Sequence, residues 1–358
     1  MAQKKKICVI ATGGTIASVP GPGGLRPGLP GERLLELAPG VAELADVDCV
    51  NLMALDSSNL LPEHWQKMAK AIAERRENYD GFVVTPGTDT MAYSAGALFL
   101  MLENIDRPVI LTGAQLPMDA PGTDAARNVL AALHAALSGR PGVYLAFAGN
   151  LHAGGAVRKL YSRQLAGFGS IDRPVAAIFK DGCYEWQWQQ PKTDGAFRLA
   201  TDLDDHIAVL KLVPGTDPAL LKLMVDAGYH AIIIEGYGAG GVPNSDSPKD
   251  FLPALSYAAE KNVRIICTTQ CVYDGTYLDT YEIGIMAMQK GAISAGRLHP
   301  ELLVPAVMLA LAQRHDRAAL EIYLRNVEEK LFRSEGRRCT KSPLPWNVSR
   351  ETIDEPCG

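Results

Sequence analysis

Short apolar runs alternate with longer amphipathic segments through the first half of the chain. Because the runs are rich in β-branched residues, they are typical of strands buried on both faces of a sheet. They predict strands over residues 6–11, 47–53, 81–85, 108–112 and 142–147. The segments between them predict helices that open at Leu61-Pro62-Glu63 and that cover about 90–103 and about 124–137. This order predicts an α/β fold with a doubly wound, mostly parallel sheet.

The apolar pattern changes after residue 185, and the chain is expected to form two domains. Residues 1–185 are predicted to be the larger N-terminal domain, and residues 186–204 a linker. Residues 205–333 are predicted to be a smaller C-terminal α/β domain, followed by a polar tail over 334–358. The second domain is expected to have strands at 206–212, 230–235 and 263–268, and helices near 217–227, 247–261, 299–313 and 316–332.

Charge and composition argue against several classes of partner. The formal net charge of −5 gives no electrostatic reason to expect nucleic acid or an anionic membrane. No apolar run approaches the ~20 residues of a membrane span, and Lys4-Lys5-Lys6 lacks the apolar region and cleavage site of a signal peptide. The seven cysteines are scattered and include no C-x-x-C pair, which favours free thiols in a cytoplasmic protein.

Two threonine-glycine segments follow predicted strands. Thr12-Gly13-Gly14-Thr15 follows the first strand, and Thr85-Pro86-Gly87-Thr88-Asp89 ends the third. Open α/β sheets build their sites at the carboxyl ends of strands, and a hydroxyl there can act as a nucleophile if a base activates it. Each segment alone also fits a structural interpretation. The first could be a phosphate cradle or a plain turn, although G-x-G-x-x-G and G-K-[ST] are absent, and Thr88-Asp89 could cap a helix.

Together with further segments in the same order, these residues resemble the bacterial-type L-asparaginases and asparaginase-glutaminases. The resemblance is closest to the cytosolic type I branch and extends over nearly the whole chain. The segments that carry it are Thr12-Gly13-Gly14-Thr15-Ile16-Ala17, Asp56-Ser57-Ser58, Gly87-Thr88-Asp89-Thr90-Met91, Thr112-Gly113-Ala114-Gln115-Leu116-Pro117 with Asp124 and Asn128, Tyr237-Gly238-Ala239-Gly240 and Thr269-Gln270-Cys271.

The resemblance implies roles for individual residues. Thr15 is expected to be the nucleophile, and Thr88 is expected to belong to a second hydroxyl–lysine–carboxylate group and to help hold the oxyanion. The family places the lysine nine residues before a phenylalanine, which here points from Phe168 to Lys159, next to Arg158. A surface charge is the alternative interpretation of Lys159.

The resemblance also implies how a substrate is held. Asp89 is expected to bind the α-amino group, and Asp56 and Ser57 are expected to hold the α-amino and α-carboxylate ends. Ala114 joins these residues as a substrate-binding position.

Several positions depart from the family pattern. Pro86 stands where many members have histidine, and Leu25 stands where type I relatives often carry a lid tyrosine, so activation of Thr15 is left to be explained. Tyr161 and Tyr273 are the candidates to replace that tyrosine.

Thr269, Gln270 and Cys271 match a segment that forms an allosteric asparagine site in some type I enzymes. The basic partner of that site is replaced by Glu235. The alternative is that Cys271 packs beneath the domain as a small apolar residue.

The resemblance implies an amidohydrolase that converts L-asparagine to L-aspartate and ammonia through an acyl-enzyme, without metal or cofactor. It also implies a homodimer or homotetramer. The seven histidines are isolated in the sequence and are interpreted as structural or surface residues: His64, His134, His152, His206, His230, His299 and His315. Glutamine or another amide as substrate, an amidotransferase component, and an amino-acid sensor without turnover are the alternative functions. The amidotransferase component would normally carry an additional N-terminal domain, for which Met1–Lys6 leaves no room.

Overall fold

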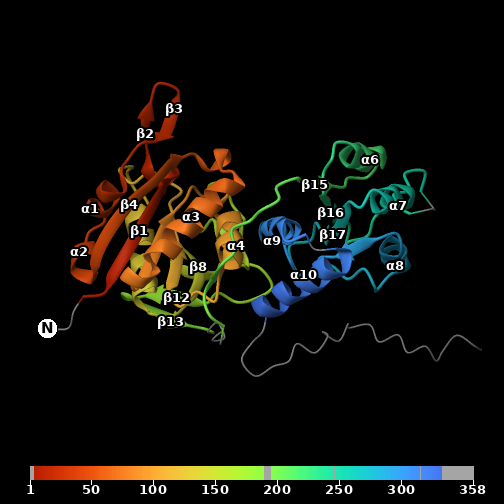
Figure 1. The fold of residues 1–358 in the computed structure, drawn as a ribbon. Coiled ribbons are helices and arrows are strands. Elements are labelled where there is room, and N and C mark those ends of the chain that lie inside the picture. The colour runs from red at the N-terminus through yellow and green to blue at the C-terminus, as the bar shows by residue number, and fades with distance from the viewer. Residues whose placement is uncertain (1–3, 189–194, 245–246, 315, 333–358) are drawn as a thin grey trace, which may run out of the picture.

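The computed structural model describes residues 4–188, 195–244, 247–314 and 316–332 (Figure 1). Its first half contains a mostly parallel sheet and its second half a smaller parallel sheet, with helices packed around both. The predicted tail over 334–358 lies outside the described residues. No helix within the described ranges is long and apolar enough to cross a membrane.

The larger sheet has eight strands and is mostly parallel, as the sequence predicts. Its parallel part places β1 (Lys6–Gly13) between β4 (Asp46–Leu55) and β5 (Gly81–Thr85) and continues through β7 and β8. Antiparallel strands then extend the sheet beyond β8. The bounds of these remaining strands are β7 (Pro108–Leu111), β8 (Gly142–Phe147), β9 (Asn150–Ala153), β12 (Ala177–Lys180) and β13 (Cys183–Trp186).

Side chains of β1 alternate between two cores, because successive residues of a strand face opposite sides of the sheet. Cys8 and Ile10 face a core shared with α3 (Pro62–Arg75) and α4 (Met91–Met101). Ile7 and Val9 face a second core. The helices on that side are α1 (Gly31–Glu36), α2 (Val41–Leu44) and α5 (Ala125–Leu137). Helices therefore cover both faces of the larger sheet, which makes it doubly wound.

The smaller sheet has four parallel strands in the order β15-β16-β17-β18. One face packs against α6 (Ala219–Asp226), α7 (Leu252–Glu260) and α8 (Glu282–Gln289). The other face packs against α9 (Pro300–Ala312) and α10 (Arg317–Phe332). The strand bounds are β15 (Ile207–Lys211), β16 (Ala231–Gly236), β17 (Arg264–Thr269) and β18 (Ala292–Ser294). The sequence pattern predicts neither α8 nor β18, and α7 begins later than the predicted 247.

The two halves of the chain share one apolar core. Leu98 of α4, Leu303 of α9 and Ile266 of β17 all belong to it. Helices α4 and α9 cross closely, since a Cβ on Gly96 would lie 2.6 Å from the carbonyl oxygen of Glu301. The helices α9 and α10 thus join the two sheets (Figure 1).

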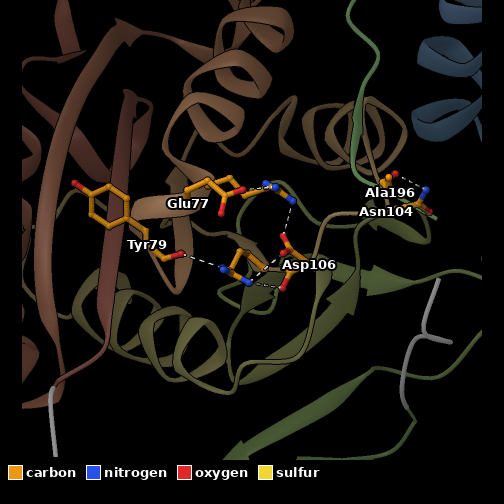
Figure 2. Close-up of polar contacts among 7 residues, drawn as sticks. Glu77, Tyr79, Asn104, Asp106 and Ala196 are labelled. Atoms are coloured by element: carbon orange, nitrogen blue, oxygen red, sulfur yellow. Dashed lines mark hydrogen bonds and ion pairs between the residues drawn. The ribbon is translucent and has the colours of Figure 1, made fainter. Parts of the chain in front are cut away.

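Residues 186–204, predicted as a linker, include short strands that attach to the larger domain. Strand β13 runs to Trp186, and β14 (Arg198–Leu199) pairs antiparallel with β6 (Leu102–Glu103). Strand β6 takes up the last residues of the predicted 90–103 helix, because the helix ends at Met101 and Asn104 turns with φ of 55°. Figure 2 shows Asn104 donating to the carbonyl of Ala196 at 3.1 Å. This contact holds the linker against the larger domain.

Candidate active site

The site lies at the carboxyl ends of β1 and β5, which are neighbours in the larger sheet. The chain leaves β1 to form β4 on one side and returns to form β5 on the other. This change of direction is a topological switch point, where open α/β sheets leave a crevice outside their strand ends. Both threonine-glycine segments therefore follow strands that border this crevice.

Two glycines bring the segments into direct contact. Gly14 has a φ of 75°, and a Cβ on it would overlap the Cα of Gly87. A Cβ on Gly87 would in turn lie 2.6 Å from the Cβ of Ser57. Because no side chain separates the two backbones, Thr15 and Thr88 each lie one residue from the same close contact.

Thr15 begins a 3-10 helix over Thr15–Ala17 at the end of β1. Its side chain is half-buried, and its hydroxyl makes no hydrogen bond with any residue that the structure describes. The neighbouring turn is fixed instead by its backbone, where Ala17 N–H and the Ser18 hydroxyl both donate to the Gly14 carbonyl at 3.1 Å. The Thr15 hydroxyl is thus held on a firm turn and left available to a ligand.

Thr88, Asp89 and Lys159 form one polar group. The Lys159 ammonium donates to the Thr88 hydroxyl at 2.8 Å and pairs with the Asp89 carboxylate at 2.7 Å. Thr88 is buried, and the Lys159 side chain is 16% exposed. Lys159 ends β10 (Val157–Lys159), where it stands opposite Phe168 of β11 (Phe168–Ser170). Lys159 is therefore not a solvated surface charge.

The remaining predicted binding residues surround this group. The Ser57 hydroxyl lies 3.3 Å from the Asp89 carboxylate and also accepts from the Asp89 N–H at 3.3 Å. The Asp56 carboxylate caps the short helix Ser57–Asn59 by accepting from Ser58 N–H. Ala114 is fully buried just after the end of β7, the next strand of the sheet.

The loop that carries Ala114 is held by its own polar contacts. The Asp124 carboxylate accepts from the N–H groups of Gln115 and Leu116 at 3.1 Å. Asn128 donates to the Gly113 carbonyl at 2.9 Å, and the Gln115 amide donates to the Gln164 carbonyl at 3.0 Å. The last bond ties this loop to the segment that follows Lys159.

A buried ion network supports the lysine strand from the second domain, which the sequence pattern does not predict. Arg158, next to Lys159, pairs with Glu301 of α9 at 3.0 Å. Glu301 also accepts from His299 at 2.9 Å, and the other ring nitrogen of His299 lies 3.0 Å from the Gly155 carbonyl. Burial acts to raise the pKa of Glu301, but the hydrogen bond and charge of His299 and the charge of Arg158 bring it below its ordinary value. The strand that carries Lys159 is thereby anchored at Gly155 and Arg158.

Leu25 lies on an antiparallel hairpin that projects beyond the larger sheet (Figure 1). The hairpin consists of β2 (Ser18–Gly21) and β3 (Gly24–Pro27), and the Leu25 side chain is 60% exposed. Tyr161 and Tyr273, the candidates to replace a lid tyrosine, are about half exposed. Leucine supplies no hydrogen bond to Thr15.

The candidate allosteric segment begins at Thr269, the last residue of β17, and its polar groups bond to the backbone. The Thr269 hydroxyl donates to the Gly238 carbonyl at 2.5 Å. The Gln270 amide donates to the carbonyls of Leu212 at 2.7 Å and Glu235 at 2.9 Å. Cys271 is exposed, so the interpretation that it packs beneath the domain is wrong.

Two of the histidines that lie apart in the sequence meet on the surface of the structure. His206 and His230 are 24 residues apart in sequence, but their rings lie side by side with centroids 5.1 Å apart. Both also contact Asp204. Parallel strand register brings these residues together, which sequence spacing alone does not reveal. His315 lies outside the described residues.

Two family models together match most of the chain. Residues 6–192 match the family model "Asparaginase, N-terminal", and residues 206–324 match "Glutaminase/Asparaginase C-terminal domain". An L-asparaginase from Thermococcus kodakarensis is 36% identical over 87% of this chain and 94% of its own. A glutamyl-tRNA(Gln) amidotransferase component of the same organism is 33% identical over 82% of this chain and 69% of its own.

Solved structures agree with these matches. The thermostable L-asparaginase from Thermococcus kodakarensis has a TM-score of 0.83 at 34% identity, and covers 89% of this chain and 96% of that one. L-asparaginase I from Vibrio cholerae has a TM-score of 0.79 at 27% identity, and covers 90% and 97% of the two chains. The chain belongs to the asparaginase family, and the resemblance to its type I branch is confirmed.

Proposed function

We propose that the chain hydrolyses L-asparagine to L-aspartate and ammonia, with Thr15 as the nucleophile. The observation that carries this proposal is the Thr88–Lys159–Asp89 group, joined to the Thr15 turn by the close contact of Gly14 with Gly87. Both family-model matches and the L-asparaginase relatives support the reaction class.

The proposed reaction is acyl transfer in two steps. The Thr15 oxygen attacks the side-chain amide carbon, the C–N bond breaks, and ammonia leaves with the proton of the hydroxyl. Water then attacks the resulting β-aspartyl ester, and aspartate is released with the Thr15 hydroxyl restored. Lys159 and Thr88 act together as the proton relay, and the Thr88 N–H stabilises the oxyanion. This scheme requires no metal or cofactor.

The ionic groups of the site suit an amino acid. In this scheme the Asp89 carboxylate, which is 62% exposed, binds the α-ammonium of the substrate. Asp56 and Ser57 complete the binding of the α-amino and α-carboxylate groups, and Ala114 is the remaining proposed binding position. We further expect a cytoplasmic homodimer or homotetramer. The free thiols of Cys8, Cys49, Cys183, Cys267 and Cys271 are consistent with that compartment.

Glutamine hydrolysis is a second candidate, because one methylene changes binding by only about 1–3 kcal/mol. A larger amide is a further candidate substrate, because amidotransferase components are among the relatives. A sensor that binds an amino acid without turnover is the third candidate. The feature that supports it is the exposed Leu25, which stands in place of a lid tyrosine.

The test is ammonia release from L-asparagine and L-glutamine by the full chain and by Thr15→Ala. We expect asparagine to be hydrolysed in preference, and the variant to lose at least about 10³ of turnover while still binding asparagine, as other nucleophile deletions do. Thr15→Ser, which retains a hydroxyl, is the matched control and should keep measurable activity. Near-normal turnover by Thr15→Ala would move the nucleophile to Thr88. Binding without ammonia release in the unaltered protein would favour the sensor.

A further inference from the structure

Two histidines meet where the smaller sheet begins. His206 directly precedes β15, and His230 directly precedes β16. The strands are parallel with Ile207 opposite Ala231, so His206 and His230 occupy neighbouring positions at the amino ends of both strands. The His230 N–H donates to the His206 carbonyl at 2.7 Å, which fixes the two backbones against each other.

One carboxylate faces both imidazole rings. Asp204 Oδ2 lies 2.6 Å from His230 Nδ1, and Asp204 Oδ1 lies 3.3 Å from His206 Nδ1. One ligand atom from each of the three residues lies within 4.8 Å of those of the other two. The three ligand atoms are therefore close enough together to hold a single ion.

The carboxylate is held in place by the backbone around it. The Asp204 N–H donates to the Met308 carbonyl of α9 at 3.0 Å, and Asp204 Oδ1 accepts the His206 N–H at 3.0 Å. The Asp204 side chain is only 21% exposed, whereas the side chains of His206 and His230 are 67% and 55% exposed. A fixed carboxylate with two accessible rings leaves open positions for water on a bound ion.

We propose that Asp204, His206 and His230 bind one transition-metal ion of the Zn²⁺, Ni²⁺ or Co²⁺ type. Two imidazoles and one carboxylate suit these borderline ions, whereas Mg²⁺ and Ca²⁺ prefer all-oxygen sites. The bound ion crosslinks the end of the linker, the start of β15 and the start of β16. Because the site forms only when these strands pair, binding stabilises the folded smaller domain.

This site is separate from the proposed catalytic group. It lies at the amino edge of the smaller sheet, whereas Thr15 and Thr88 follow the carboxyl ends of strands in the larger sheet. Its role is therefore structural, and its test does not depend on ammonia release.

The experiment is a titration of the full chain, without a polyhistidine tag and freed of metal by a chelator, with Co²⁺, Zn²⁺ and Mg²⁺. We expect one Co²⁺ per chain with a visible spectrum of nitrogen and oxygen ligands, and a midpoint of thermal unfolding that rises with Zn²⁺ but not with Mg²⁺. His206→Gln, His230→Gln and Asp204→Asn should each weaken binding at least tenfold. Circular dichroism verifies that each variant is folded.

The matched control is Asp205→Asn, which removes an adjacent charge. Its carboxylate lies 3.6 Å from His206 Nδ1 and is 64% exposed, and we expect its loss to change affinity less than threefold. The proposal would be overturned if no metal bound, or if the cobalt spectrum showed a thiolate band from exposed cysteines such as Cys183. It would also be overturned if Asp205→Asn lowered the metal affinity as much as Asp204→Asn.

Discussion

The carboxyl edges of the parallel strands in both sheets carry threonines at or within three residues of the strand ends. In the larger sheet, the Thr15 hydroxyl makes no hydrogen bond with a described residue, and the Thr88 hydroxyl bonds to Lys159. In the smaller sheet, the Thr269 hydroxyl bonds to the Gly238 carbonyl, and Gln270 bonds to two further carbonyls. The same residue types therefore form the proposed site at one edge and brace loops at the other.

The source of the difference is a lysine that reaches the larger sheet from outside its parallel strands. Lys159 comes from the β10–β11 hairpin, which Arg158 and Glu301 connect to α9 of the second domain. At the end of β17, by contrast, the Thr269 and Gln270 side chains bond to backbone carbonyls. We therefore expect a threonine at a strand end to take part in catalysis only where another element places a charged side chain next to it.

Removal of the Lys159 charge is expected to have the largest effect on turnover. Lys159→Met should lower turnover of asparagine by at least about 10³, because the proton relay of the proposed mechanism is removed. The measurement is ammonia release at saturating substrate. Lys180→Met removes an exposed lysine of β12 and should leave turnover unchanged. An active Lys159→Met variant would show that the two edges do not differ in the way proposed.

The second-largest effect is expected from glycine substitution, which should lower turnover at the edge of the larger sheet but not at that of the smaller sheet. Gly87→Ala places a Cβ 2.6 Å from Ser57, which pushes apart the two segments of the proposed site. We expect turnover to fall about 100-fold, since small displacements of reacting groups cost that much. Gly238→Ala has a φ of 50° but meets no atom within 4 Å, so it should cost only about 1 kcal/mol of stability and leave turnover unchanged.

Both Gly variants need to be compared in two assays, ammonia release and denaturant unfolding. Equal losses of turnover would mean that the edge of the smaller sheet also serves catalysis. A folded Gly87→Ala variant with normal turnover would contradict the close contact of the two segments.

Disruption of the ion network between the domains should have an intermediate effect on turnover. In Glu301→Gln, Arg158 loses its buried ionic partner, at a cost of about 3 kcal/mol. If the network positions Lys159, kcat should fall about tenfold with little change in KM, at a temperature well below the unfolding midpoint. Glu103→Gln breaks the Arg198–Glu103 ion pair, in which the Arg198 side chain is 59% exposed, and should change neither value. A lower midpoint with unchanged kcat would reduce the network to a stabilising role.

Much of this site could be predicted from sequence, and the exceptions have physical reasons. The apolar runs predict the parallel strands, and the motifs after β1 and β5 predict the shared crevice, because strand ends in a parallel sheet lie at one edge. The contact of Lys159 with Thr88 follows from a family spacing and not from periodicity. The pairing of Glu301 with Arg158 and the meeting of His206 with His230 depend on helix packing and strand register. Those are tertiary features that local patterns do not encode.

The short elements also escape sequence analysis. Strands β6 and β14 have two residues each, and β10 and β11 have three, so no alternation can be recognised in them. Helix α8 follows a polar stretch with several exposed tyrosines, and its buried residues are only Gly284 and Ala287. Pairing with the rest of the fold determines these elements more than their own sequence does.

The smallest effect on activity is expected at Gln270. Gln270→Leu removes two bonds to backbone carbonyls, which should lower the free energy of unfolding by about 1–3 kcal/mol. Because these bonds brace loops of the smaller sheet, the dependence of ammonia release on asparagine concentration should be unchanged. Cys271→Ser, at an exposed position, should change neither property.

A sigmoidal dependence in the unaltered protein that becomes hyperbolic in Gln270→Leu would instead identify an asparagine site at Thr269, Gln270 and Cys271. The two edges would then both bind substrate, and only the presence of Lys159 would separate turnover at one from regulation at the other.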